Sequence, residues 1–112
     1  MARVAALIPD LLFGSKVQGA LRAAGHDVEL VSGAEAVGDV EVVVVDLTAD
    51  GVDPGELVRA LAGGEARTLG FFAHVQPEVR ERALAAGFDQ VVPRSRMARE
   101  GADLVARLTR TA

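Results

Sequence analysis

Four consecutive valines, residues 42–45, are followed directly by Asp46. A short, β-branched apolar run of this kind predicts a strand that is buried on both faces. Such strands belong to parallel sheets that carry helices on both sides. In open sheets of this class the functional crevice lies beyond the carboxyl ends of the strands, so we expect Asp46 to face that crevice.

The composition predicts one domain with an aliphatic core. A chain of 112 residues is long enough for one core and too short for two. Its only aromatic residues are four Phe, and the absence of Cys excludes disulfides, thiolate metal sites and cysteine nucleophiles. No apolar run approaches the ~20 residues of a membrane span, and the first residues do not resemble a secretory signal. We therefore expect a cytoplasmic protein without a membrane partner.

Charge is distributed unevenly along the chain, whose formal net charge is −4. Nine acidic residues and no Lys or Arg lie between Arg22 and Arg59. By contrast, residues 94–110 contain five Arg and only two acids, which we interpret as the solvated face of a last helix. Nucleic-acid binders combine a strong basic surplus with interleaved aromatic residues. The chain has neither, so we expect no nucleic-acid partner.

Apolar periodicity and residues typical of helix boundaries predict five strands that alternate with helices. The predicted strands are 4–8, 28–31, 40–46, 69–73 and 90–93. The predicted helices are 11–24, 54–61, 77–86 and 97–110, and the first three are bounded by Pro, Asp or Gly. This alternation predicts an α/β fold with right-handed crossovers. Five strands in this rhythm fit a flavodoxin-like, doubly wound parallel sheet of order 2-1-3-4-5 over residues 1–112.

The connection between the second and third predicted strands is unusually short. Its eight residues, 32–39, reach at most ~26 Å when extended. They must return along a strand of ~17 Å and step across a neighbour, whereas crossovers need at least ~10–12 residues including a helix. We therefore expect a strap with a single helical turn at most, which leaves part of one sheet face poorly covered. A homodimer would cover such a face.

Several segments together resemble the receiver domain of bacterial response regulators, the CheY-like family. Residues 3–25 match the length of the family's first strand and helix, and 42–53 resemble its third strand and the loop that follows. Residues 82–87 (RALAAG) look like the end of its fourth helix, and 91–94 (VVPR) look like its fifth strand. The resemblance runs from Arg3 to the last helix. It implies a role in signal transduction by phosphorelay, with Asp46 at the phosphoacceptor position.

The chain departs from this family where phosphoryl chemistry needs carboxylates. Transfer to a carboxylate brings anions together, so Mg²⁺ must neutralise them, and Mg²⁺ is usually held by one or two carboxylates. The family's acidic pair at the end of the first strand falls here on Ile8 and Pro9. Asp10 follows them, but a role at the helix start suits it better. We therefore expect no cofactor, with weak Mg²⁺ binding by Asp10 and Asp46 as the alternative.

Two further family positions differ in this sequence. The Ser or Thr that hydrogen-bonds the phosphoryl group aligns with Phe72 or Ala73, neither of which has a hydroxyl. Arg94 stands where the family has Lys and could hold a phosphate through two hydrogen bonds. Ser95 follows it where the family has Pro, usually on a cis bond. We interpret Asp46 as a retained polar group that pairs with Arg94.

Two more polar residues belong to the predicted crevice. Thr48 lies where receivers vary the side chain that faces the phosphoryl site, although it could equally be a turn residue. His74 follows the fourth strand, and a lone His beside one carboxylate is usually an ordinary exposed residue rather than half of an acid–base pair. The sequence has no metal-ligand spacing and no Gly-rich phosphate loop. We therefore do not expect an enzyme.

Three hypotheses follow from these residues. The first is an atypical, or pseudo-, receiver that binds a protein partner in signalling without phosphorylation, through residues 32–39, residues 11–13 or the side formed by the last two helices. The second is a functional response regulator that is phosphorylated on Asp46, with Asp10 and Arg94 compensating for the lost acids. The third is a small-ligand or anion sensor. Its crevice would be lined by Asp10, Asp46, Thr48, His74 and Arg94.

Overall fold

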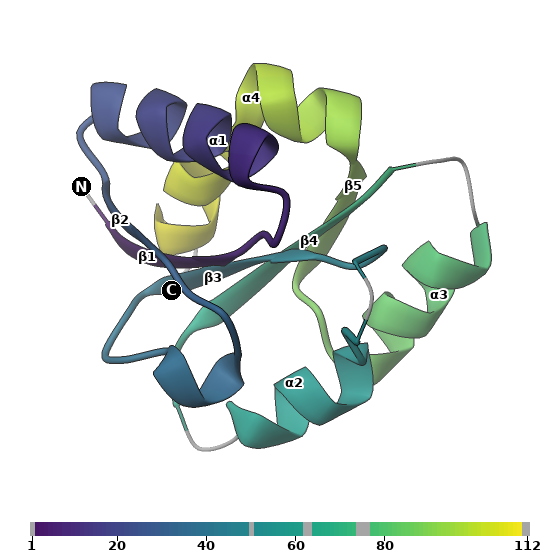
Figure 1. The fold of residues 1–112 in the computed structure, drawn as a ribbon. Coiled ribbons are helices and arrows are strands. Elements are labelled where there is room, and N and C mark those ends of the chain that lie inside the picture. The colour runs from purple at the N-terminus through teal and green to yellow at the C-terminus, as the bar shows by residue number, and fades with distance from the viewer. Residues whose placement is uncertain (1, 50, 62–63, 74–76, 111–112) are drawn as a thin grey trace.

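The computed structural model describes residues 2–49, 51–61, 64–73 and 77–110. They form a parallel sheet of five strands in the order β2-β1-β3-β4-β5. The strands are β1 (Arg3–Leu7), β2 (Asp27–Leu30), β3 (Val42–Asp46), β4 (Arg67–Phe72) and β5 (Gln90–Pro93). The helices are α1 (Leu11–Ala23), α2 (Pro54–Ala60), α3 (Pro77–Ala86) and α4 (Arg94–Arg110). This arrangement confirms the predicted flavodoxin-like α/β fold and its strand order (Figure 1).

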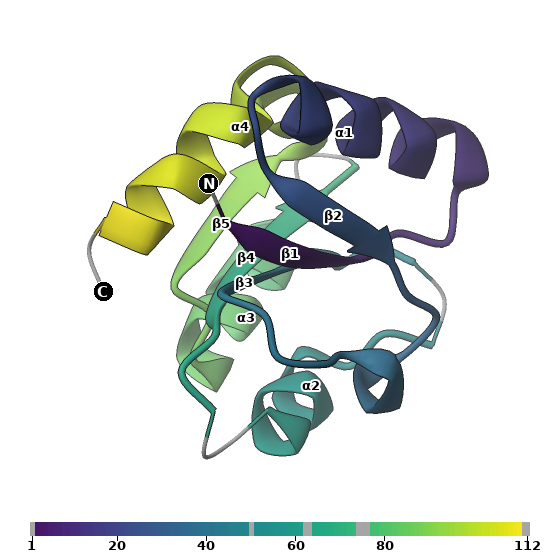
Figure 2. The same ribbon diagram turned by 90° about the vertical axis from the view of Figure 1, so that its left-hand side faces the viewer.

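The helices form two layers, one on each face of the sheet. Helices α1 and α4 cover one face, and α2 and α3 cover the other (Figures 1 and 2). No helix among the described residues is both long and apolar enough to cross a membrane.

The central strand β3 is buried on both faces, as its valines predict. Val42 and Val44 pack in the cluster formed with α1 and α4, whereas Val43 and Val45 pack in the cluster formed with α2 and α3. All four side chains are 0% exposed. Full burial of one such side chain is worth about 1.5–3 kcal/mol. The run therefore holds both layers to one sheet and fixes the position of Asp46 at its carboxyl end.

Local residues set most of the helix boundaries. Asp10 caps α1 by accepting hydrogen bonds from backbone N–H groups of its first turn. Pro54 is the first residue of α2, and the Asp53 carboxylate caps that helix. Helix α4 is the exception, because it begins at Arg94, directly after β5, and not at residue 97 as predicted. The prediction relied on apolar residues, and residues 94–96 are all polar.

The strap between β2 and β3 contains one short 3₁₀ helix, η1 (Ala34–Ala36), which confirms the expected single turn. The expected uncovered sheet face is not found. Leu7, Val43 and Val45 are 6%, 0% and 0% exposed on the face that the strap crosses. The strap packs Val37 and other partly buried apolar residues against this cluster. An extended strap can therefore cover the face, because apolar side chains rather than helical structure supply the contacts.

Candidate functional site

Asp46 lies at the carboxyl end of β3, where the valine run predicts it. Only 6% of the residue is exposed. Its Oδ1 accepts hydrogen bonds from the Thr48 backbone N–H at 3.1 Å and from the Thr48 hydroxyl at 2.9 Å. Such a turn around an Asp side chain is common where a strand ends in a loop. The structure therefore brings Asp46 and Thr48 together and directs one carboxylate oxygen of Asp46 to its own loop.

Arg94 pairs with Asp10, and not with Asp46 as expected. Its Nη2 donates a hydrogen bond to Asp10 Oδ2 at 3.0 Å, and the two side chains are 33% and 44% exposed. The other oxygen of Asp10 accepts from the Leu12 and Phe13 N–H groups at 3.0 and 3.2 Å. Both oxygens of Asp10 are thus engaged. The expected pairing was wrong because α4 begins at Arg94, which brings the guanidinium to the start of α1.

These contacts change the acidity of Asp10. Its pKa lies below the ordinary value of 3.8, first because the Phe13 N–H donates to the carboxylate and next because Arg94 donates to it. Both donors favour the charged form. The site therefore keeps Asp10 ionised and committed to the helix start.

An aromatic pair lies beneath Arg94. The Arg94 guanidinium carbon is 4.0 Å from the centre of the Phe13 ring, and the Phe13 and Phe71 ring centres are 5.2 Å apart. A guanidinium at this distance is attracted to the ring face. Phe13 itself is 8% exposed, so it belongs to the core and cannot form part of a docking surface as proposed for residues 11–13. Leu11 and Leu12 are 75% and 87% exposed and remain available at the surface.

The residues that replace the acidic pair cannot hold a metal ion through their side chains. Leu7 pairs with Val45 in the sheet register, so Ile8 comes one residue further along, beside the end of β3. Ile8 is 4% exposed and packs in the core with α1 and α4, and Pro9 follows it. Across the described ranges, no three His, Asp or Glu side chains are grouped as a metal site would require.

The end of β4 carries no hydroxyl at the two aligned positions. Phe72 is 7% exposed and packs in the cluster with α2 and α3, and Ala73 follows it at the surface. His74 lies outside the described residues. Of the five predicted crevice residues, the structure thus joins Asp46 to Thr48 and Asp10 to Arg94.

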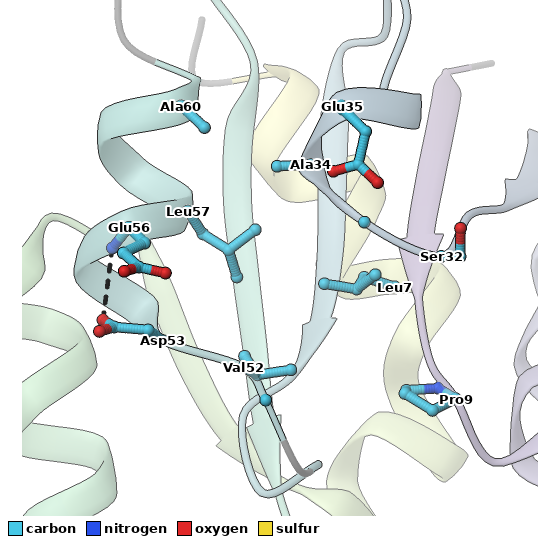
Figure 3. Close-up of a pocket in the computed structure, with 12 residues that line it drawn as sticks. Leu7, Pro9, Ser32, Ala34, Glu35, Val52, Asp53, Glu56, Leu57 and Ala60 are labelled. Atoms are coloured by element: carbon cyan, nitrogen blue, oxygen red, sulfur yellow. Dashed lines mark hydrogen bonds between the residues drawn. The ribbon is translucent and has the colours of Figure 1, made fainter.

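A pocket that the sequence analysis did not predict lies near the carboxyl ends of β1 and β3. Its volume is about 320 Å³, and it opens between the strap and α2 (Figure 3). The lining comes from the end of β1, the strap, the loop before α2 and α2 itself; it consists of Leu7, Pro9, Ser32, Gly33, Ala34, Glu35, Gly51, Val52, Asp53, Glu56, Leu57 and Ala60. We call it the strap pocket. The short strap and the nine acids between Arg22 and Arg59 are the sequence signals for this pocket.

Comparison with solved structures identifies many with the same fold. The receiver domain of the Francisella response regulator 1452 matches with a TM-score of 0.84 at 15% identity, over 99% of this chain and 98% of that one. The receiver domain of the putative response regulator NarL from Mycobacterium tuberculosis also has a TM-score of 0.84, at 20% identity and over 99% and 98% of the two chains. A response regulator receiver protein from Burkholderia phymatum matches at 0.84 and 23% identity, over 100% and 98%.

No family model and no curated protein sequence matches the chain. The likeness is therefore one of structure at low identity, and it extends over essentially the whole chain. The shared frame is the five-stranded parallel sheet of order β2-β1-β3-β4-β5 with its helices. The chain has the fold of response regulator receiver domains.

Proposed function

We propose that this chain is an atypical receiver that serves in signalling by binding a protein partner, without phosphoryl transfer to Asp46. The supporting observation is the engagement of Asp10, the nearest acid in sequence to the missing pair. One of its oxygens caps α1 and the other binds Arg94. The pairing also occupies Arg94, which takes the place of the family's Lys.

The physical argument concerns charge. A phosphoryl group and a carboxylate repel one another unless a divalent cation lies between them. Mg²⁺ gives up water reluctantly and is held by carboxylates in a nearly octahedral arrangement. Ile8 and Pro9 supply no carboxylate, and recruiting Asp10 would cost its cap and its ion pair. Asp46 alone is then a poor magnesium site and a poor phosphoryl acceptor.

A protein partner is favoured by the exposed leucines at the start of α1. Leu11 and Leu12 are adjacent and are 75% and 87% exposed, although large apolar side chains are usually buried. Exposed apolar side chains that protrude together are typical of protein contact sites. They lie beside the Asp10–Arg94 pair, so a partner that covers them would also contact charged groups.

The experiment tests phosphorylation and metal binding directly. The receiver domain of DrrB has been solved in a BeF3-activated form, so beryllofluoride with Mg²⁺ is a suitable probe of the same fold. We expect no change in the amide NMR signals of Asp46 and Thr48 with this probe. We also expect no mass increase after incubation with acetyl phosphate and Mg²⁺. A receiver that retains the acidic pair provides the positive control.

A matched variant decides between the first two hypotheses. If the chain gains a phosphoryl group or responds to beryllofluoride, and Asp46→Asn abolishes the response, Asp46 is a phosphoacceptor and our proposal is wrong. Pro9→Asp provides the converse test, because it adds a carboxylate at an exposed position at the end of β1. We expect this variant to bind Mg²⁺ more tightly than the unmodified chain.

A further inference from the structure

The strap pocket occupies the place in the fold where ligands are expected. The chain leaves β1 toward β2 on one side and leaves β3 toward β4 on the other, so the strand order reverses between β1 and β3. Open α/β sheets bind ligands outside the carboxyl ends of the strands at this switch point. The pocket reaches it through Leu7 and Pro9. Its volume of about 320 Å³ is at the small end of the ~300–1,000 Å³ typical of small-molecule sites.

The pocket has an apolar interior and an acidic rim. Leu7 from β1 and Leu57 from α2 extend into the space between the strap and the helix (Figure 3). Glu35 lies on the strap side, and Asp53 and Glu56 lie on the α2 side (Figure 3). A ligand in this space would therefore contact hydrocarbon along its length and carboxylates at its end.

The rim acids form no ion pair with their neighbours on the described lining of the pocket. None of the described residues that line the pocket is Lys or Arg. None of the ion pairs formed within the described part of the chain involves Glu35, Asp53 or Glu56. The carboxylate of Asp53 accepts the Gly55 and Glu56 backbone N–H groups, which leaves its charge in place. Arg59 of the same helix lies near Asp53, because its Nη1 and Asp53 Oδ1 would lie 3.3 and 3.4 Å from a Cβ added at Gly55. Glu35 and Glu56 are therefore the rim acids that carry the proposal.

The Glu35 carboxylate folds over Gly33, where an added Cβ would lie 2.5 Å from Oε1 and 2.7 Å from Oε2. A side chain at position 33 would push this carboxylate away. The placement of Glu35 thus depends on the absence of a side chain at Gly33, which offers a way to move the charge without removing it.

We propose that the strap pocket binds a small organic cation, an ammonium or guanidinium group on a short aliphatic chain. The chain would pack against Leu7 and Leu57, and the cation would lie between the carboxylates of Glu35 on the strap and Glu56 on α2. A bare metal ion fits less well, because no metal-binding group of three side chains occurs among the described residues and the interior is apolar. The proposal does not depend on the proposed function, since the pocket uses neither Asp46 nor Arg94.

The test uses four probes of one length that differ in charge: butylguanidinium, butylammonium, butanol and butyrate. Titrations followed by amide NMR should show saturable shifts at residues 32–35 and 52–57 for the two cations only. The double variant Glu35→Gln/Glu56→Gln should weaken their binding by about tenfold or more, since it removes two charges from the rim. Glu81→Gln, an exposed acid on α3 outside the pocket, is the control and should leave affinity within about twofold.

Two further variants separate pocket binding from general attraction to an acidic protein. Gly33→Ala keeps every charge and should weaken binding by displacing Glu35. Ala60→Leu also keeps every charge and should compete with the ligand for space. Equal loss in Glu81→Gln, shifts spread over the surface, or binding of butyrate as tight as that of butylammonium would each overturn the proposal. Absence of saturable binding by either cation would overturn it as well.

Discussion

Asp10 connects the start of α1 to the start of α4 through its two carboxylate oxygens. The partner in α4 is 84 residues away in sequence, so the contact depends on how β1 and β5 are placed in the sheet. Local hydrogen bonds and a distant guanidinium both favour the ionised carboxyl. Asp10 therefore both neutralises Arg94 and caps α1.

Acid should weaken the fold through this residue. The pKa of Asp10 is lower in the folded chain than its ordinary value of 3.8, so the unfolded state binds more protons over that interval and stability rises with pH. The contribution is fully present above about pH 4 and is lost as the pH falls through the folded pKa. We expect Asp10→Asn to be less stable than the unmodified chain at pH 7. Urea unfolding should show this difference shrink toward pH 2, and a constant difference would contradict the role of charge.

Gly70 of β4 is tightly packed on the face of the sheet that α2 and α3 cover. A Cβ at this position of β4 would lie 2.6 Å from Leu47 Cδ1 and 3.2 Å from Phe88 Cδ2. We expect Gly70→Ala to lower the free energy of unfolding by about 1–3 kcal/mol, the usual cost of overpacking. Gly19→Ala is the control, because nothing lies within 4 Å of the added Cβ in the middle of α1. It should raise stability by about 0.5–1 kcal/mol, as thermal or urea unfolding can measure.

Among the elements, the strap differs most from a standard α/β crossover. Its single turn η1 is too short to present a helical face, yet the sheet beneath it is buried. Cover comes from apolar side chains of an extended segment that pack beside α2. Because the strap is short, it also leaves the strap pocket open between itself and α2. The small number of residues between β2 and β3 therefore explains both the extended cover of the sheet and the pocket.

The strap should therefore contribute measurably to stability. Val37 is half-buried against the cluster that contains Val43 and Val45. We expect Val37→Ser to lower the free energy of unfolding by about 1 kcal/mol, since part of a Val side chain leaves the core. Ala36→Ser at the neighbouring exposed position should stay within about 0.5 kcal/mol. Equal effects of the two variants would show that the strap does not stabilise the sheet.

At the scale of the whole molecule, two apolar clusters share a single sheet. One lies under α1 and α4 and the other under α2 and α3, and β3 contributes two valines to each. Neither layer can be removed without exposing the central strand. The sequence predicts a homodimer because it would cover an exposed sheet face. That face is buried within the chain, so it no longer provides a reason for dimerisation. Sedimentation at several concentrations tests the oligomeric state directly.

The shared strand predicts cooperative unfolding. Small single domains usually unfold in one transition, and here both clusters depend on β3. We expect Val17→Ala in one cluster and Leu57→Ala in the other to shift the whole transition. Circular dichroism should agree with the methyl NMR signals of both faces, because helices and core side chains are lost together. Transitions that separate by face would indicate that the two layers unfold independently.

The sequence by itself determined the order of the elements, the parallel sheet and the position of Asp46. These follow from local signals: the period of apolar residues, Pro and Asp at helix starts, and Gly at helix ends. The single turn of the strap followed from a count of residues and the reach of the chain. Such features depend on residues that are close together in the sequence, so they can be predicted without knowing the tertiary structure.

Only the tertiary structure decided which charged groups meet. Arg94 and Asp46 both follow strands, which predicts that they pair, but the start of α4 directs Arg94 to Asp10 instead. The burial of Phe13 and the strap pocket likewise depend on contacts between segments far apart in the chain. A side chain reaches only a few ångströms, so a shift of three residues in the start of one helix is enough to change its partner.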